Sequence, residues 1–132
     1  MTHFRVTEAA ALLGVSDDTV RRWIDADRLP AVRDGAGRWS VQGRDLAEFA
    51  RDQASPPQVQ GAAATSASNR MPGLVTRVER AGLMAEVEIQ AGPFRVVSLM
   101  SAATADALGL EPGVLAVASV TPHDVVVETT SR

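Results

Sequence analysis

Residues 6–24, VTEAAALLGVSDDTVRRWI, decide the fold of the N-terminal part of this chain. They predict two short helices joined by a tight turn. Gly14 can adopt the positive φ that ends the first helix, and Ser16 is a good N-cap for the second. The second helix carries apolar residues at the i, i+3, i+4 spacing of a buried stripe: Val20, Trp23 and Ile24.

Two helices with this turn are typical of a helix-turn-helix, in which the second helix presents its early residues to the DNA major groove. A plain helical hairpin without DNA binding is the alternative. Polar and basic side chains on and after the second helix are therefore the predicted contacts to double-stranded DNA. The predicted DNA-binding residues are Ser16, Asp18, Thr19, Arg21, Arg22 and Arg28, with Arg33 and Arg38 further along.

The residues that follow predict a β-hairpin and a closing helix. Residues 31–33 and 38–41 are expected to be short strands around a turn at 34–37, the wing of a winged helix. Arg33 and Arg38 flank the tip of this wing, where a phosphate would lie, and Trp39 is expected to pack on the helices. A helix over 46–50 completes a predicted DNA-binding domain of residues 1–52.

Residues 7–16, TEAAALLGVS, with residues 20–23, VRRW, and Leu29-Pro30 after them, resemble the MerR-like and excisionase-like winged helix-turn-helix domains. The resemblance implies binding to double-stranded DNA. Because one such domain contacts few bases, paired half-sites are expected.

Composition narrows the function classes. The chain has 132 residues, and its 45% hydrophobic and 22% charged residues are globular values. Its net charge of −3 argues against a DNA-coating protein. It lacks cysteine, so disulfides and thiolate metal sites are excluded, and His123 with Asp124 offers too few ligands for a metal.

Neither a Walker loop nor G-x-G-x-x-G is present, so an enzyme is not expected. Without a membrane-length apolar run or a secretion signal, the expected location is cytoplasmic, away from membranes.

A change of character separates the two halves of the chain. Residues 53–65 have no charge and no apolar period, and they predict a flexible linker. Residues 66–132 form the second predicted domain. Its strands are expected at 74–79, 84–89, 94–100, 114–120 and 125–128, with a helix at 102–108. Five short strands and one helix predict a small closed barrel of the OB type, and therefore an α+β multi-domain fold.

Motifs in this half resemble the Mop domain, the molybdate-binding, TOBE-type barrel of ModE-like regulators, molbindins and some transporter subunits. The family's S-A-R-N opening corresponds to residues 66–69, SASN, and its L-G-L-x-x-G corresponds to residues 108–113, LGLEPG. The resemblance implies a site for molybdate or tungstate between barrels. It also implies homo-oligomers, from a dimer up to a hexamer, in which strands cross between subunits.

The family holds its oxyanion with hydroxyls, backbone N–H groups and two cations. The positions of its Arg and Lys hold Ser68 and Thr121 here. Two lost charge-assisted hydrogen bonds weaken binding by about 10²-fold or more, although Arg70, two residues from Ser68, could compensate. The predicted ligand-binding residues are Ser66, Ser68, Asn69, Ser98, Ser101, Thr104 and Thr121.

Together these patterns predict a transcription regulator that binds DNA through its first domain and senses an oxyanion through its second. Two alternatives remain at this point. One is a molybdate-storage protein. The other is a DNA-architectural factor whose barrel has lost oxyanion binding and either binds another ligand or only forms oligomers.

Overall fold

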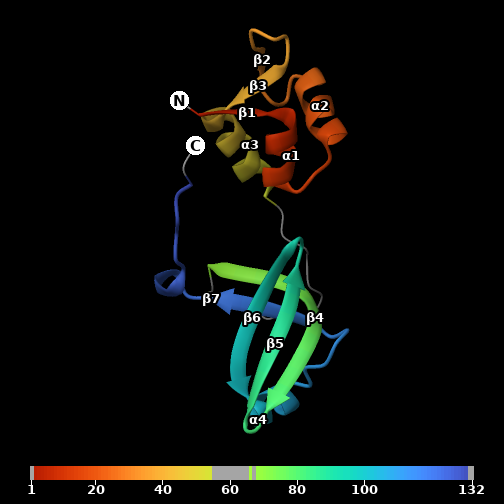
Figure 1. The fold of residues 1–132 in the computed structure, drawn as a ribbon, viewed down its shortest axis with the longest axis vertical. Coiled ribbons are helices and arrows are strands. Elements are labelled where there is room, and N and C mark those ends of the chain that lie inside the picture. Colours follow the sequence, from red (N-terminus) through yellow and green to blue (C-terminus); the bar gives the residue numbers. More distant parts are fainter. Residues whose placement is uncertain (1, 55–65, 67, 131–132) are drawn as a thin grey trace. The chain divides into compact units, whose positions relative to one another are not determined.

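The computed structural model describes residues 2–54, 66 and 68–130 (Figure 1). The chain divides into two compact units, Met1–Ser55 and Pro56–Arg132. Of the predicted linker, Gln53 ends a helix and residues 55–65 lie outside the described residues.

The N-terminal unit packs three helices with a three-stranded antiparallel sheet of order β1-β3-β2 (Figure 1). Gly14 ends the first helix with φ 69°, as its position in the turn predicts. The helices are α1 (Val6–Leu13), α2 (Asp17–Asp25) and α3 (Gly43–Gln53), and the strands are β1 (His3–Arg5), β2 (Val32–Arg33) and β3 (Trp39–Gln42).

The core of this unit lies where the three helices meet the sheet. Val20, Val41 and Leu29 are essentially inaccessible, and the rings of Trp23 and Phe49 pack 4.8 Å apart. Trp39 lies partly buried against the same cluster, as the sequence predicts. The remaining buried members are Val6, Ala9, Ala10, Ile24, Leu46 and Phe49.

Two features of this unit differ from the predictions. The closing helix starts at Gly43 and continues to Gln53, so it is longer than expected and passes residue 52. The strand β1 was not predicted. It pairs with β3, with Phe4 opposite Val41 and Arg5 opposite Ser40, and three residues are too few for a periodic signal.

The C-terminal unit is a four-stranded antiparallel sheet of order β6-β5-β4-β7 with one short helix (Figure 1). Its core is centred on Val75, Val87 and Ile89. The elements are β4 (Asn69–Ala81), β5 (Met84–Ala91), β6 (Phe94–Ser101), α4 (Ala102–Ala107), β7 (Leu115–Val120) and the 3₁₀ turn η1 (Pro122–Asp124).

Strand β4 is much longer than predicted because it serves two partners in succession. Residues 69–74 pair with β7, and residues 74–81 pair with β5, with an irregular register between Val75 and Arg77. Gly73 lies where this change of partner occurs. A Cβ there would overlap the carbonyl of Gln90 and lie 2.9 Å from Cγ2 of Ile89, so the close approach of β4 to β5 requires glycine.

The prediction of a closed barrel is wrong for the single chain. Among the described residues, β6 and β7 are unpaired edges of the sheet and residues 125–128 form no strand. The turn η1 ends β7 and leads the chain off the sheet, and Val126 and Val127 are 84% and 83% exposed. Consecutive β-branched residues favour a strand, but a strand also has to pair with a neighbour, and this segment leaves the sheet after η1.

The open sheet leaves an apolar hollow of about 450 Å³ on one side. Its lining includes Val87, Ile89 and Met100 from the sheet, with Leu110 and Val114 from the connection that precedes β7. In the part of the chain that the structure describes, no helix is long and apolar enough to cross a membrane.

Candidate DNA-binding and oxyanion sites

The start of α2 is fixed by a hydroxyl pair. The Oγ of Ser16 accepts the backbone N–H of Thr19 at 3.2 Å, and the two side-chain oxygens lie 2.9 Å apart. Asp17 and Asp18 fall in the first turn, where negative charge favours the helix dipole. The buried side chains Val20 and Ile24 hold one face of α2 on the core. The opposite face is therefore presented to solvent in a fixed orientation.

The predicted arginines of this region are exposed, and each has a local contact. Arg21 pairs with Asp18 at 3.5 Å, and Arg22 donates from Nη2 to the Thr19 hydroxyl at 3.2 Å. The guanidinium of Arg28, which follows α2, lies 5.8 Å from the ring centre of Phe49. Such exposed contacts are weak, so Arg21 and Arg22 can exchange them for a partner.

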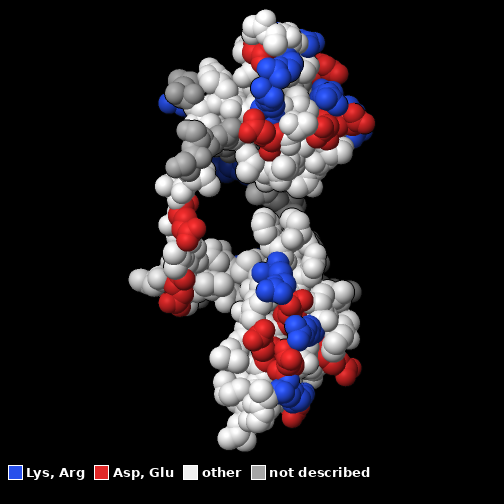
Figure 2. Space-filling view, in the orientation of Figure 1, with Lys and Arg blue, Asp and Glu red and all other residues white. Residues whose placement is uncertain are grey.

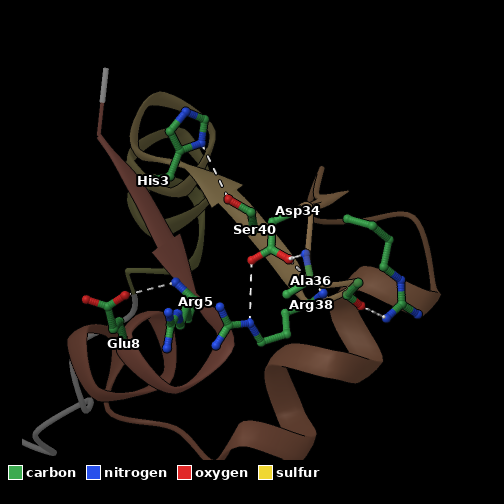
Figure 3. A network of polar contacts seen from close by, with 9 residues as sticks. His3, Arg5, Glu8, Asp34, Ala36, Arg38 and Ser40 are labelled. Carbon is green, nitrogen blue, oxygen red and sulfur yellow. Dashed lines mark hydrogen bonds and ion pairs between the residues drawn. The ribbon is translucent and has the colours of Figure 1, made fainter.

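Asp34 organises the tip of the wing. Its Oδ1 accepts the N–H groups of Ala36 at 2.8 Å and Arg38 at 3.0 Å, and its Oδ2 lies 3.6 Å from Nε of Arg38 (Figure 3). The hydrogen bond from the Arg38 N–H holds the pKa of Asp34 below its usual value of 3.8, although desolvation of the carboxylate acts in the opposite direction. The Ala36 N–H and the positive charges of Arg38 and Arg5 lower this pKa further. The carboxylate therefore stays charged at neutral pH and fixes the turn.

Arg33 is held differently from Arg38. Its guanidinium stacks over the Trp39 ring at 4.0 Å from the centre and donates to the Gly37 carbonyl at 2.8 Å. These contacts stiffen the hairpin from within. Arg33 is thus part of the wing's framework, a role that its position beside the tip did not predict.

Side chains from four segments of the N-terminal unit line one open hollow of about 380 Å³. Three of the predicted arginines, Arg21, Arg33 and Arg38, meet there, whereas Arg22 and Arg28 do not line it. A fourth arginine, Arg5, lines it too and was missed. The signal that could have found it is the pairing of β1 with the wing, which depends on a contact far away in the sequence. The space-filling view shows basic and acidic side chains interleaved on this unit (Figure 2).

The predicted oxyanion ligands fall into separate groups in the single chain. Asn69 and Thr121 lie near one another, because Asn69 opens β4 opposite Val120 and donates from Nδ2 to that residue's carbonyl at 3.1 Å. Ser66 and Ser68 precede this point and are exposed. The amide of Asn69 is already committed to joining β4 to β7.

Ser101 and Thr104 lie at the other end of the sheet. Ser101 caps α4 by accepting the Thr104 N–H at 3.1 Å, and the two hydroxyls lie 2.8 Å apart. Ser101 pairs with Met84, next to the end of β4. Twelve residue steps of β4 correspond to about 40 Å of strand. Ser98, opposite Val87 on β6, lines the apolar hollow and belongs to neither group. One chain therefore does not bring the predicted ligands together.

The charge around Thr121 is unfavourable for an anion. Its hydroxyl donates to Oδ2 of Asp124 at 2.5 Å, so a carboxylate lies beside the position where the resembling family keeps its Lys. Arg70 lies next to Asn69 and opposite Ser119. Three other arginines of this unit pair with carboxylates: Arg77 with Glu79, Arg80 with Asp106 and Arg95 with Glu88. Among the described residues, no group of three or more His, Cys, Asp or Glu could hold a metal ion.

Comparisons with known proteins divide the chain at the same place. Residues 4–54 match the model of a helix-turn-helix domain. Residues 65–127 match the model of the TOBE domain. No curated protein matches the chain.

Among solved structures, MopII from Clostridium pasteurianum is 28% identical, with a TM-score of 0.48, and the match covers 50% of this chain and all of that one. A molybdate-binding protein from Sporomusa ovata is 19% identical, with a TM-score of 0.48, and the match covers 51% of this chain and all of that one. The chain therefore has one region that matches the helix-turn-helix model and another that matches the TOBE model.

Proposed function

We propose that this protein is a transcription regulator that binds double-stranded DNA through its N-terminal unit and a molybdate- or tungstate-type oxyanion through assembled C-terminal units. The observation that carries the DNA part is the orientation of α2. Its capped first turn and buried stripe fix the opposite face, on which Arg21 and Arg22 are exposed, within a region that matches a helix-turn-helix domain. The pattern of that region further suggests the MerR-like or excisionase-like branch.

Substitution of Arg22 tests the DNA part. Arg22→Ala should weaken binding of the full chain to duplexes selected from a random library by about 1–3 kcal/mol, if the guanidinium contacts a base edge. Arg51→Ala, on the last turn of α3, removes the same charge away from α2 and serves as the matched control. Equal affinities for the two variants would contradict a role for α2 in base recognition.

Assembly is proposed from the open sheet. Strand edges β6 and β7 are unpaired in the described chain, and residues 125–128 leave the sheet as an exposed, β-branched segment. If this segment paired with a free edge of a second copy, the backbone hydrogen bonds of both the segment and that edge would be formed. An exposed edge strand favours such pairing. The proposed assembly ranges from a dimer to a hexamer. A chain ending at Asp124 should form an oligomer of fewer subunits than the full chain, as measured by light scattering. Equal numbers of subunits would contradict this arrangement.

Oxyanion binding is proposed from the motif resemblance and the TOBE match, with residues of different copies forming the site. Asp124 beside Thr121 and the missing cations make this site weaker than the family pattern. Molybdate, tungstate and sulfate should each be tested by thermal melting of the full chain. A ligand at 100 times its dissociation constant stabilises by about 2.7 kcal/mol.

A charge-restored variant separates a weakened site from an absent one. Ser68→Arg with Thr121→Lys returns both family cations, so its melting shift at equal ligand concentration should exceed that of the natural chain. Ala47→Arg with Gln53→Lys adds the same charge at exposed positions of α3 in the N-terminal unit and is the control. If neither the natural chain nor the restored variant responds, the oxyanion assignment fails, and the alternative of a DNA-binding factor with a purely assembling barrel takes its place.

A further inference from the structure

The hollow between β1, α2 and the wing contains two arginines whose positions the fold fixes relative to each other. Arg5 ends β1 opposite Ser40 of β3, and Arg38 lies two residues before Ser40, directly before β3 begins, where its carbonyl accepts the Asp34 N–H at 2.8 Å. Diagonal neighbours of this kind on adjacent antiparallel strands leave the same face, with separations of about 7–8 Å. Figure 3 shows both side chains directed toward one region beside Asp34, and both line the hollow.

The backbone at Arg5 is anchored on both sides. Its N–H donates to Oε1 of Glu8 at 3.1 Å, which caps α1, and its pairing with Ser40 ties it to the wing strand. Arg33, stacked on Trp39, forms part of the wall. Arg5 and Arg38 are therefore two exposed cations on a rigid frame, and both line the same hollow.

Asp34 balances this charge when no partner is bound. Its Oδ2 lies 3.6 Å from Nε of Arg38. The Asp34 side chain is 33% exposed and that of Arg38 is 53% exposed. An exposed pair of this length is easily exchanged for a better acceptor. A phosphate offers that exchange, because its oxygens accept the planar guanidinium fork in two parallel hydrogen bonds.

The geometry points to a phosphate seat in which Arg5 and Arg38 together bind one backbone phosphate of DNA, with Asp34 as the group that the phosphate replaces. This inference rests on the proposed DNA-binding function. It assigns a role to Arg5 and specifies that the two arginines serve one phosphate. A free phosphate ion offers the same chemistry, so the experiment distinguishes the two sources.

The test is binding of the full chain to a mixed-sequence duplex over a series of salt concentrations. Each neutralised phosphate contributes about 0.9 to the slope of log affinity against log salt. Either arginine alone still neutralises a shared phosphate. Arg5→Ala and Arg38→Ala should therefore each retain most of the contribution that this phosphate makes to the slope. The double variant should lose about 0.9, one phosphate's worth, whereas two independent contacts would lose about 1.8.

Three further variants complete the design. Arg51→Ala should leave the slope unchanged, and Arg5→Lys should retain it by keeping the charge. Asp34→Asn preserves an acceptor for the Ala36 and Arg38 N–H groups while removing the carboxylate, so it should tighten duplex binding by about twofold to fivefold at low salt. Cooperative melting of each variant at the melting temperature of the natural chain confirms that the N-terminal unit remains folded.

The outcomes separate the inference from the proposed function. A natural chain that binds no duplex overturns both. If the natural chain binds and Arg22→Ala weakens it, but the double variant behaves like Arg51→Ala or loses about 1.8, the shared seat alone is overturned. Inorganic phosphate at millimolar concentration should not change the melting temperature. Saturable stabilisation by that ion, lost in the double variant, would reassign the seat to a free anion.

Discussion

Ser16→Ala removes the cap that begins α2, and its consequences reach from stability to DNA binding. The substitution deletes the acceptor of the Thr19 N–H and the hydroxyl partner of the Thr19 side chain. That side chain in turn accepts from Arg22. The change therefore loosens the first turn of the helix while leaving every core side chain in place.

The expected cost follows from the kind of contact that is lost. A Ser, Thr or Asp N-cap replaced by Ala costs about 1 kcal/mol, and up to about 2 kcal/mol in tertiary structure. Both the backbone bond and the side-chain pair are exposed, which favours the lower figure. For a domain of this size, 1 kcal/mol lowers the melting temperature by about 4–8 °C.

Two matched variants make the assay specific. Ser16→Thr keeps the hydroxyl cap and should melt within a few tenths of a kcal/mol of the natural chain. Ser16→Asp also caps the helix, yet it adds negative charge at the surface proposed to face DNA, so stability should be retained while duplex affinity falls. Calorimetry gives the first readout, and fluorescence anisotropy with a labelled duplex gives the second.

Equal melting temperatures for Ser16→Ala and the natural chain would refute the cap as a source of stability. Duplex binding by Ser16→Asp that equals the natural chain at low salt would refute the placement of this turn against DNA. The two readouts fail independently, so one result does not obscure the other.

Three other predictions follow from packing and charge. Val20→Ala, at a position with no exposure, should destabilise the N-terminal unit by about 2–3 kcal/mol in denaturant unfolding, whereas the exposed Val32→Ala should cost far less. Gly73→Ala should destabilise the C-terminal unit by about 1–3 kcal/mol, because its Cβ meets the backbone of Gln90; unchanged stability would contradict that close approach. Carboxyl NMR should place the Asp34 midpoint below 3.8, so its contribution to the wing is complete at neutral pH and is lost as pH falls through that lower midpoint; a midpoint at or above 3.8 would contradict the network.

The helix-turn-helix could be predicted from sequence because its signals are local. Gly14, Ser16 and the stripe on α2 lie within a dozen residues, and each acts on its own turn. Arg5 could not be placed in the same way. Its position depends on pairing with Ser40, and a strand of three residues has no period to detect.

The C-terminal half shows the same limit at larger scale. Alternation predicts five strands and the sheet contains four of them, because barrel closure depends on which edges meet. Residues 125–128 have the composition of a strand but pair with neither edge of the sheet in the single chain. Likewise, Asn69 and Ser101 match a ligand pattern in sequence while the sheet places them at opposite ends of β4.

The most direct test of the central claim is the ratio of affinities for a library-selected duplex and a mixed-sequence duplex, measured with the full chain at physiological salt. A regulator that recognises base edges through α2 should bind the selected duplex at least about 10³-fold more tightly. The selected sequences should contain two half-sites, as expected for an assembled protein. A ratio near one, or failure of any sequence to be enriched, would contradict sequence-specific DNA binding by this protein.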